Sequence, residues 1–431
     1  MNLIQRTGRT RLVRRMASLL AARLAELPLE SLRDPRARRS RWSIRRLLTM
    51  VIAGIAAGAK GLAEVENLSE SLGDGARRLL RLPTRVPDTT LRDVLVRLDV
   101  GELRGLLQRS LEQALRRKQL RHNLPLRVAS MDGKHTATWL FDRAEADAKY
   151  GQRQQGRTVV RTITTCLASA DGCPCLDAFP IPPKSNEVSA FQMAGAALLE
   201  RWRGHLDVLR YDAGGCSLGN ASWVRSNCLD YVFVLAENQP ELMVEARRCL
   251  LDSDLTPAVE QVRVEGANVV TRRLFLHALS SEGGVEGYLG WTHLRTILRV
   301  ETTRADKATK RTTTENKYYL TSLQASRLEP DAWLTLLRRR WAVENENHNI
   351  WDRILREDDR PFILAPQGML VVQLLRRLVY NMLTLFRSVT LRAESSRATP
   401  WKELLRSIHL TLTVATVTML EGIRSRPQAT V

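Results

Sequence analysis

The chain has 431 residues, of which 44% are hydrophobic and 26% are charged, and its formal net charge at pH 7 is +20. This composition can bury a large core and excludes global disorder, and the length allows two or three domains. The positive excess predicts a nucleic acid as partner, although charge can also serve solubility alone.

The charge is concentrated at the start of the chain. Residues 1–60 contain thirteen arginines and Lys60 against three acidic residues, which is more than half of the total excess. Arginine binds phosphate through two parallel hydrogen bonds from its planar guanidinium. The first 60 residues are therefore the first candidate for contacts with a polyanion.

Cysteine usage and apolar runs exclude several classes of protein. None of the six cysteines forms a CxxC pair, and no histidine stands at zinc-finger spacing from one, so a zinc site is not expected. Few cysteines and no visible signal peptide predict reduced thiols and a cytoplasmic location. The longest apolar run, residues 47–59, is too short to span a bilayer and predicts a buried helix.

Residues 9–120 have apolar side chains at helical spacing, with arginine on the opposite faces. A helix is expected to start near Pro87, with Asp88 or Thr89 as its cap. These patterns predict an all-α, basic N-terminal domain over residues 1–120.

From about residue 124 the pattern changes to alternating strands and helices. Strands are expected at 125–133, 158–169, 175–181, 206–215 and 230–237, helices at 187–204 and 220–227, a strand-rich insertion at 258–320, and helices over 331–355 and from there to the C-terminus. This order predicts an α/β fold with a mixed sheet and helices packed on it.

Two aspartates follow predicted strands in this region. Asp132 follows "RVAS" and precedes Gly133, and Asp212 follows "VLRY" and precedes Ala-Gly-Gly. Each is equally well explained as part of a turn. If the two strands are neighbours, however, both carboxylates meet at one edge of the sheet, where they can bind Mg²⁺ for phosphodiester cleavage.

A third carboxylate comes from "RRRWAVENENHNIWD", residues 338–352. On an α-helix, Arg340, Glu344, His348 and Trp351 share one face, whereas Glu346 lies about 200° around the axis from Glu344. This phase selects Glu344 for the site and leaves Glu346 in solvent. The alternative for Glu344 is an ion pair with Arg340, which contributes only a few tenths of a kcal/mol.

Together these segments resemble a known family. "MDGKH" (131–135), "YDAGG" (211–215) and "RWAVENENHNIWDRILREDD" (340–359) look like the three signature regions of bacterial insertion-sequence DDE transposases, and the H-repeat-associated group is the most similar group we can name. "DTTLRDVLVRLD" (88–99), "KSNEVSAF" (184–191) and "ENKYYLTSL" (315–323) also match. The resemblance covers residues 33–390, and the order of the motifs makes it specific.

The resemblance implies a fold and a reaction. It implies an RNase H-like core over residues 124–390, with a β-rich insertion at about 240–320, an α-helical N-terminal domain, and a C-terminal helical segment over 391–431. Asp132, Asp212 and Glu344 would bind two Mg²⁺ or Mn²⁺ ions for cleavage of the element's ends and 3′-OH strand transfer into target DNA. The implied partners are double-stranded DNA, comprising terminal inverted repeats and target, and a second copy of the chain; a membrane is not among them.

The sequence departs from relatives around the third acid. Many relatives have Y-x2-R-x3-E-x6-K there; Arg340 and Glu344 match, but Leu337 and Trp351 stand at the Tyr and Lys positions. The H-repeat group usually continues from "DGK" to "RGS", whereas this chain continues as "HTATW". These differences concern contacts to DNA ends and the subgroup, and leave the three acids in place.

Further residues are candidates for DNA contacts. Lys134, Arg340, Asn345 and His348 are the candidates, and each has a structural alternative: an exposed lysine, an ion pair, a surface amide and a structural histidine. Glu187 is expected to open a helix beside the site. The basic segment 304–317 either contacts DNA backbone or is a solvated hairpin loop. Two other functions stay open: a catalytically inactive DNA-binding protein derived from a transposase, and a nuclease without strand transfer.

Overall fold

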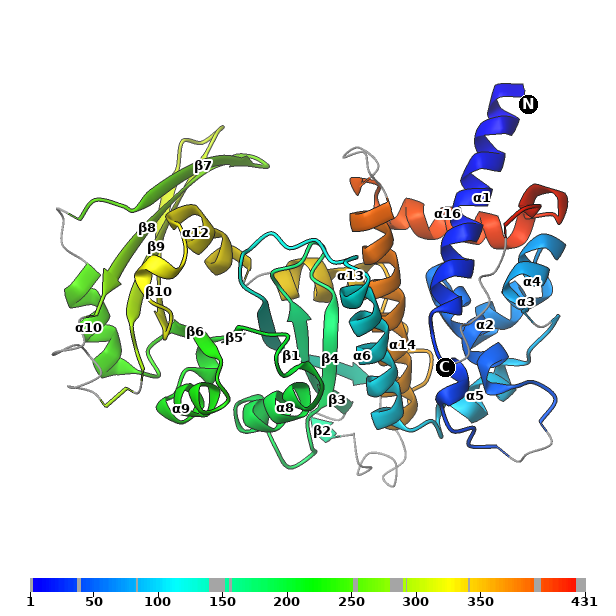
Figure 1. The fold of residues 1–431 in the computed structure, drawn as a ribbon, viewed down its shortest axis with the longest axis horizontal. Helices are drawn as coiled ribbons and strands as arrows, with labels where there is room; N and C mark the ends of the chain where they lie inside the picture. The colour runs from blue at the N-terminus through cyan, green and yellow to red at the C-terminus, as the bar shows by residue number, and fades with distance from the viewer. Residues whose placement is uncertain are drawn as a thin grey trace.

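A long mixed sheet crosses one half of the molecule, and a helical assembly forms the other half (Figure 1). This computed structural model describes residues 3–36, 40–82, 84–138, 152–154, 157–250, 255–279, 290–291, 293–339, 342–390 and 397–423. The fold is mixed α/β, as predicted from the alternation of periods along the sequence. All six cysteines are free thiols.

The centre of the sheet is built from the first half of the α/β region. Its strands are β1 (Val128–Thr138), β2 (Gln152–Gln154), β3 (Arg157–Leu167), β4 (Cys175–Pro180), β5 (Val208–Tyr211) and β6 (Asp230–Leu235). β3 pairs antiparallel with β1 on one side and with β2 and β4 on the other, whereas β1, β5 and β6 are parallel neighbours. The short strand β2 was not predicted.

Four more strands extend this sheet on the far side of β6. They are β7 (Val259–Glu265), β8 (Asn268–Ala278), β9 (Thr296–Asp306) and β10 (Thr312–Thr321), in the order β6-β10-β9-β8-β7 and all antiparallel. The helix α10 (Pro240–Leu250) precedes them. The segment expected to be a strand-rich insertion is thus hydrogen-bonded into the central sheet and does not form a separate one.

Each face of the central strands packs against its own core, because strand side chains alternate between faces. Val128, Val208 and Val232 join the core that contains α14 (Pro366–Leu385). Ala129 and Leu209 join the other core, with α8 (Glu187–Trp202), α9 (Leu218–Ser226) and α10. The parity of a residue number in β1 or β5 therefore gives the face to which its side chain points.

Both ends of the chain build the helical half. Its helices are α1 (Leu3–Ala25), α2 (Ile44–Ala56), α3 (Leu62–Glu70), α4 (Asp74–Leu80), α5 (Asp88–Leu95), α6 (Val100–Arg116), α14 and α16 (Trp401–Val414). α1 packs along α16, and α14 packs against α6, α2 and β4. The apolar run 47–59 lies largely in α2 and is buried from Leu47 to Ala56, as predicted.

α14 is long and apolar enough to cross a membrane by length and composition alone. The apolar window within Pro366–Ser388 is entirely buried inside the protein, however, which is the behaviour of a core helix. At the start of α5 the predicted cap is wrong: Pro87 is the N-cap, and no side chain caps that end.

The predicted helix over residues 331–355 is interrupted. α12 (Pro330–Arg338) is followed by a π-helix over Val343–His348 and then by α13 (Asn349–Arg353). The N–H of Asn349 donates to the carbonyl of Glu344, five residues earlier, which is the π-helical pattern. A π-helical turn contains more residues than an α-helical turn. Residues that would share one face of an α-helix therefore do not share a face across this segment.

Candidate active site

Asp132 and Asp212 come from neighbouring parallel strands. Ser130 of β1 is the register partner of Arg210 of β5, so Asp132 and Asp212 stand two residues further along each strand, at the same level. Strand alternation assigns the side chain of Asp132 to the face covered by α14, the side of Ser130, and Asp212 is close enough for its charge to act on Asp132. Asp212 directly follows β5, but Asp132 lies inside β1, which continues six residues beyond it; the prediction of a strand end was wrong there.

Glu344 reaches this pair from the π-helix. Burial, together with the negative charges of Glu344, Asp212 and Glu187, raises the pKa of Asp132 to about 7. A carboxylate responds this way when other carboxylates lie close to it without intervening cations. Among the described residues, none of the three predicted acids has an ion pair with lysine or arginine.

A fourth acid, Glu187, flanks the site from the other face of the sheet. It is the first residue of α8, which Asn186 and Ser189 cap reciprocally, so the predicted helix start is confirmed. His135 Nε2 lies 2.8 Å from Glu187 Oε1. A Cβ at position 133 would come within 2.0 Å of this carboxylate, so Gly133 provides the space that Glu187 occupies.

His348 lies between the site and a neighbouring ionic cluster. Its Nδ1 is 3.6 Å from Asp132 Oδ2, so the acid nearest to it is Asp132. Burial, with the positive charges of Lys134 and Arg377, lowers the pKa of His348 to about 3. The imidazole is therefore neutral near pH 7, and its buried Nε2 has no hydrogen-bond partner.

Lys134 belongs to that neighbouring cluster. Its side chain is buried, and its Nζ lies 2.7 Å from Asp352, 3.3 Å from Asp358 and 3.9 Å from Glu357. This overturns the alternative of an exposed lysine, and in this arrangement the ammonium is turned away from solvent. Its role in DNA binding stays a prediction that the arrangement does not favour.

The same cluster contains a fully buried ion pair between Glu357 and Arg377. Arg377 Nη2 donates to Glu357 Oε1 at 2.8 Å, and the guanidinium stacks on the Trp351 ring at 3.8 Å. Burial alone would raise the pKa of Glu357, but Arg377 and Lys134 lower it to about 2. Trp351, which stands at the lysine position of relatives, is a core residue with no exposed surface.

Arg210 connects β5 to the helix that leads to Glu344. It is buried and donates to the carbonyls of Leu336 at 2.5 Å and Leu337 at 2.9 Å, at the end of α12. Arg210 precedes Asp212 by two residues, and Lys134 follows Asp132 by two. Each aspartate strand thus carries a buried cation on the same face, and these cations hold the two ends of the segment that contains Glu344.

Glu346, which the helical phase left in solvent, is partly buried, with 37% of its side chain exposed. It pairs with Arg339, whose guanidinium also donates to the carbonyls of Ala168 and Ala170 at 2.7 Å. Burial raises the pKa of Glu346. Asn345 is exposed, and Arg340 lies outside the described residues.

Two groups of acids are candidates for cation binding. Among the described residues, Asp352, Glu357 and Asp358 form the one group of three whose oxygens all lie within 4.8 Å of one another, and Lys134 and Arg377 already neutralise it. Asp132, Asp212 and Glu344 are more widely spread but lack a cation. Three hard oxygen donors that repel one another fit divalent metal ions, which would relieve that repulsion.

Comparison with known proteins adds a match in the helical half. Residues 28–109 match the model of a family described as DDE_Tnp_1-associated, which supports a relationship of this stretch to DDE-type transposases. No curated protein matches the chain. A solved piggyBac transposase synaptic complex with hairpin DNA is similar with a TM-score of 0.40 and 11% identity, over 97% of this chain and 85% of that one. That likeness is too distant to assign residues or activity.

Proposed function

We propose that the chain is a DNA transposase of the DDE type, in which Asp132, Asp212 and Glu344 form the active site. The observation that carries this proposal is the mutual repulsion of the three carboxylates around Asp132, in a site without a lysine or arginine partner among the described residues. The match of residues 28–109 supports it independently, because it lies in another part of the chain.

The strand order favours an RNase H-like core within this proposal. β4, β3 and β1 are antiparallel neighbours, and β1, β5 and β6 continue the same sheet in parallel. Parallel strands place their carboxyl ends at one edge, which is where open α/β sheets bind ligands. Asp212 follows β5 at that edge, and Asp132 stands beside it.

Each residue has a separate task in the proposed reaction. Asp132, Asp212 and Glu344 would hold two Mg²⁺ or Mn²⁺ ions, which supply an activated water or 3′-OH and neutralise charge on the leaving oxygen. The neutral imidazole of His348 would be a polar neighbour of Asp132 and would add no positive charge to the site. Arg210 and Lys134 fix the Glu344 segment against the two aspartate strands.

The partner would be double-stranded DNA, bound as terminal repeats and as target by a homodimer in the bacterial cytoplasm. Several arginines of the helical half are exposed, including Arg11, Arg33 and Arg46. Others are already engaged: Arg14, for example, donates to the carbonyls of Met419 and Glu421. The exposed group would supply the salt-dependent part of DNA affinity.

The test uses the two glutamates that stand two residues apart. An oligonucleotide carrying the element's terminal repeat is incubated with Mg²⁺ and wild type, Glu344→Gln or the matched control Glu346→Gln. At saturating protein concentration, where differences in DNA affinity do not enter, we expect Glu344→Gln to cut at least about a hundred-fold more slowly, whereas Glu346→Gln keeps a cleavage rate near that of wild type, because only Glu344 would face the reacting phosphate. Equal cleavage by all three proteins would sink the site assignment.

Two other results would point to other functions. End binding without cleavage by wild type would favour an inactive DNA-binding protein. Cleavage products without joined target strands would favour a nuclease.

A further inference from the structure

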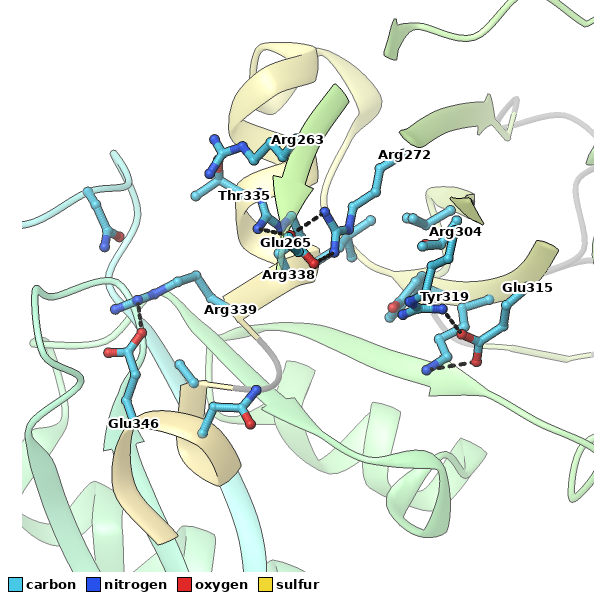
Figure 2. Close-up of a pocket in the computed structure, with 17 residues that line it drawn as sticks. Arg263, Glu265, Arg272, Arg304, Glu315, Tyr319, Thr335, Arg338, Arg339 and Glu346 are labelled. Carbon is cyan, nitrogen blue, oxygen red and sulfur yellow. Dashed lines mark hydrogen bonds and ion pairs between the residues drawn. The ribbon is translucent and has the colours of Figure 1, made fainter. Parts of the chain in front are cut away.

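A basic cleft lies beside the start of the π-helix. It has a volume of about 590 Å³ and is bounded by the β7–β10 extension, α12 and the first turn of the π-helix (Figure 2). Its cationic lining residues are Arg263, Arg272, Arg304, Lys317, Arg338 and Arg339. Three carboxylates line it as well, so the cleft has an excess of positive charge.

The excess is sharpest around Glu265, at the end of β7. Arg272 donates to both oxygens of Glu265, at 2.8 and 2.9 Å, and Arg338 lies 3.6 Å from the same carboxylate. Arg263 is exposed and has no ion-pair partner among the described residues. Burial, followed by repulsion from Arg272 and Arg263, lowers the pKa of Arg338. One carboxylate therefore serves two guanidinium groups, and the exposed Arg263 lines the same cleft and adds to their repulsion.

The same face of the sheet continues into the basic segment 304–317, which forms the exposed end of the β9–β10 hairpin, and β9 is the hydrogen-bonded neighbour of β8. Arg304 and Lys317 both lie near Glu315, at 3.5 and 3.0 Å. Each of these two groups on the sheet thus presents cations that share a single carboxylate. Figure 2 shows the two groups side by side, as expected for neighbouring strands.

The position of the cleft relates it to the proposed active site. Asn345 and Glu346 line it, so the residues directly after Glu344 form its floor. A strand that passes Glu344 and continues around the π-helix would enter the cleft. Guanidinium forks match the two free oxygens of a phosphodiester as well as they match a carboxylate.

We propose that this cleft binds a phosphate of the nucleic-acid backbone, and that the phosphate displaces Glu265 from Arg272 and Arg338. The inference rests on the proposed function for its choice of partner. Glu265 then acts as an internal competitor: it keeps the guanidinium groups ordered while the cleft is empty and lowers the affinity for a strand.

The experiment measures binding separately from cleavage. Anisotropy of a fluorescein-labelled duplex is recorded with the full chain in EDTA, at several salt concentrations. Arg263→Gln, on an exposed side chain, should weaken binding about five-fold and reduce the slope of log affinity against log salt by about one. Glu265→Gln should tighten binding by about three-fold, because the competitor loses its charge.

Matched variants outside the cleft control for net charge. Arg248→Gln, on α10, removes one positive charge from a residue paired with Glu245. Glu260→Gln, on the same strand as Glu265, removes one negative charge from a residue paired with Arg273. Both should bind the duplex like wild type. If the controls shift affinity as much as the cleft variants do, only overall charge matters and the inference is wrong.

A competition arm identifies the source of the phosphate. Inorganic pyrophosphate is added to the complex of protein and duplex. If duplex binding stays intact, the ligand of the cleft is a phosphate of the nucleic-acid backbone. If the same pyrophosphate concentrations displace the duplex, the cleft is instead a site for a free anion. The melting temperature of each variant is recorded to exclude unfolding. If wild type does not cut the duplex while the cleft variants still bind it differently, the proposed function is wrong and the proposal for the cleft stands. If both cleft variants bind the duplex like wild type, only the proposal for the cleft is wrong.

Discussion

Two neighbouring groups of carboxylates differ in whether cations neutralise them. Asp132, Asp212 and Glu344 repel one another, and the pKa of Asp132 rises to about 7. Asp352, Glu357 and Asp358 surround Lys134, and Arg377 completes their neutralisation. One strand, β1, contributes to both groups through Asp132 and Lys134. The neutralised acids stabilise the fold, whereas the other three acids have no lysine or arginine partner in the described part of the chain and are the candidates for binding a metal ion.

The largest effect should follow from breaking the neutralised group. Glu357→Gln leaves Arg377 charged and fully buried, which should lower the free energy of unfolding by about 3–5 kcal/mol in urea titrations. The pKa of Glu357 falls from 4.5 to about 2 on folding, so its stabilisation is present above pH 4.5 and is lost as pH falls through 2. The difference between wild type and variant should therefore be constant from pH 8 to pH 5 and shrink only at lower pH. A difference that disappears between pH 7 and pH 5 would contradict this assignment.

A smaller effect should follow from removing the link between the aspartate strand and the Glu344 segment. Arg210→Met leaves the carbonyls of Leu336 and Leu337 without their donor and should cost about 2–3 kcal/mol of stability. Single-turnover cleavage should slow while DNA affinity in EDTA stays unchanged, since Glu344 is displaced but the DNA contacts are not. Arg210→Lys should restore part of the rate. A purely structural role would instead change both measurements together or neither.

The smallest stability effect should have the opposite sign. Asp132→Asn removes one of the repelling charges and should raise the free energy of unfolding by about 1 kcal/mol at pH 8 in EDTA. Millimolar Mg²⁺ should raise the melting temperature of wild type, because it binds the folded site, and should leave the variant unchanged. An equal Mg²⁺ response in both proteins would show that the ions bind elsewhere.

The sequence predicted the mixed α/β fold and the three acids, because these depend on local patterns. Strand periodicity places Asp212 at the end of β5, and side-chain alternation then aligns it with Asp132. The catalytic role of these residues stays a prediction. The partners of Lys134 could not be predicted, because they come from residues more than 200 positions away, and "REDD" (356–359) carried no signal for a buried cation cluster.

The π-helix accounts for a second group of errors. An α-helical wheel assigned Trp351 to the face of Glu344, whereas Trp351 is fully buried and Glu344 is exposed. No simple pattern distinguishes a π-helical turn from an α-helical one. The same wheel left Glu346 in solvent, whereas Glu346 is partly buried, because the wheel could not show that Arg339 approaches from the end of the preceding helix.

The joining of the two chain ends in the helical half has a consequence for biosynthesis. α1 packs along α16, and α2 and α6 pack against α14, so these three helices are synthesised well before the two helices that complete their core. Until residues 366–414 are made, the faces of α1, α2 and α6 that pack on α14 and α16 stay uncovered by these two helices. Contacts between residues so distant in sequence form slowly, and the exposed faces invite aggregation meanwhile. We expect a nascent chain stalled before α14 to depend on chaperones, and a complete chain to be released from them.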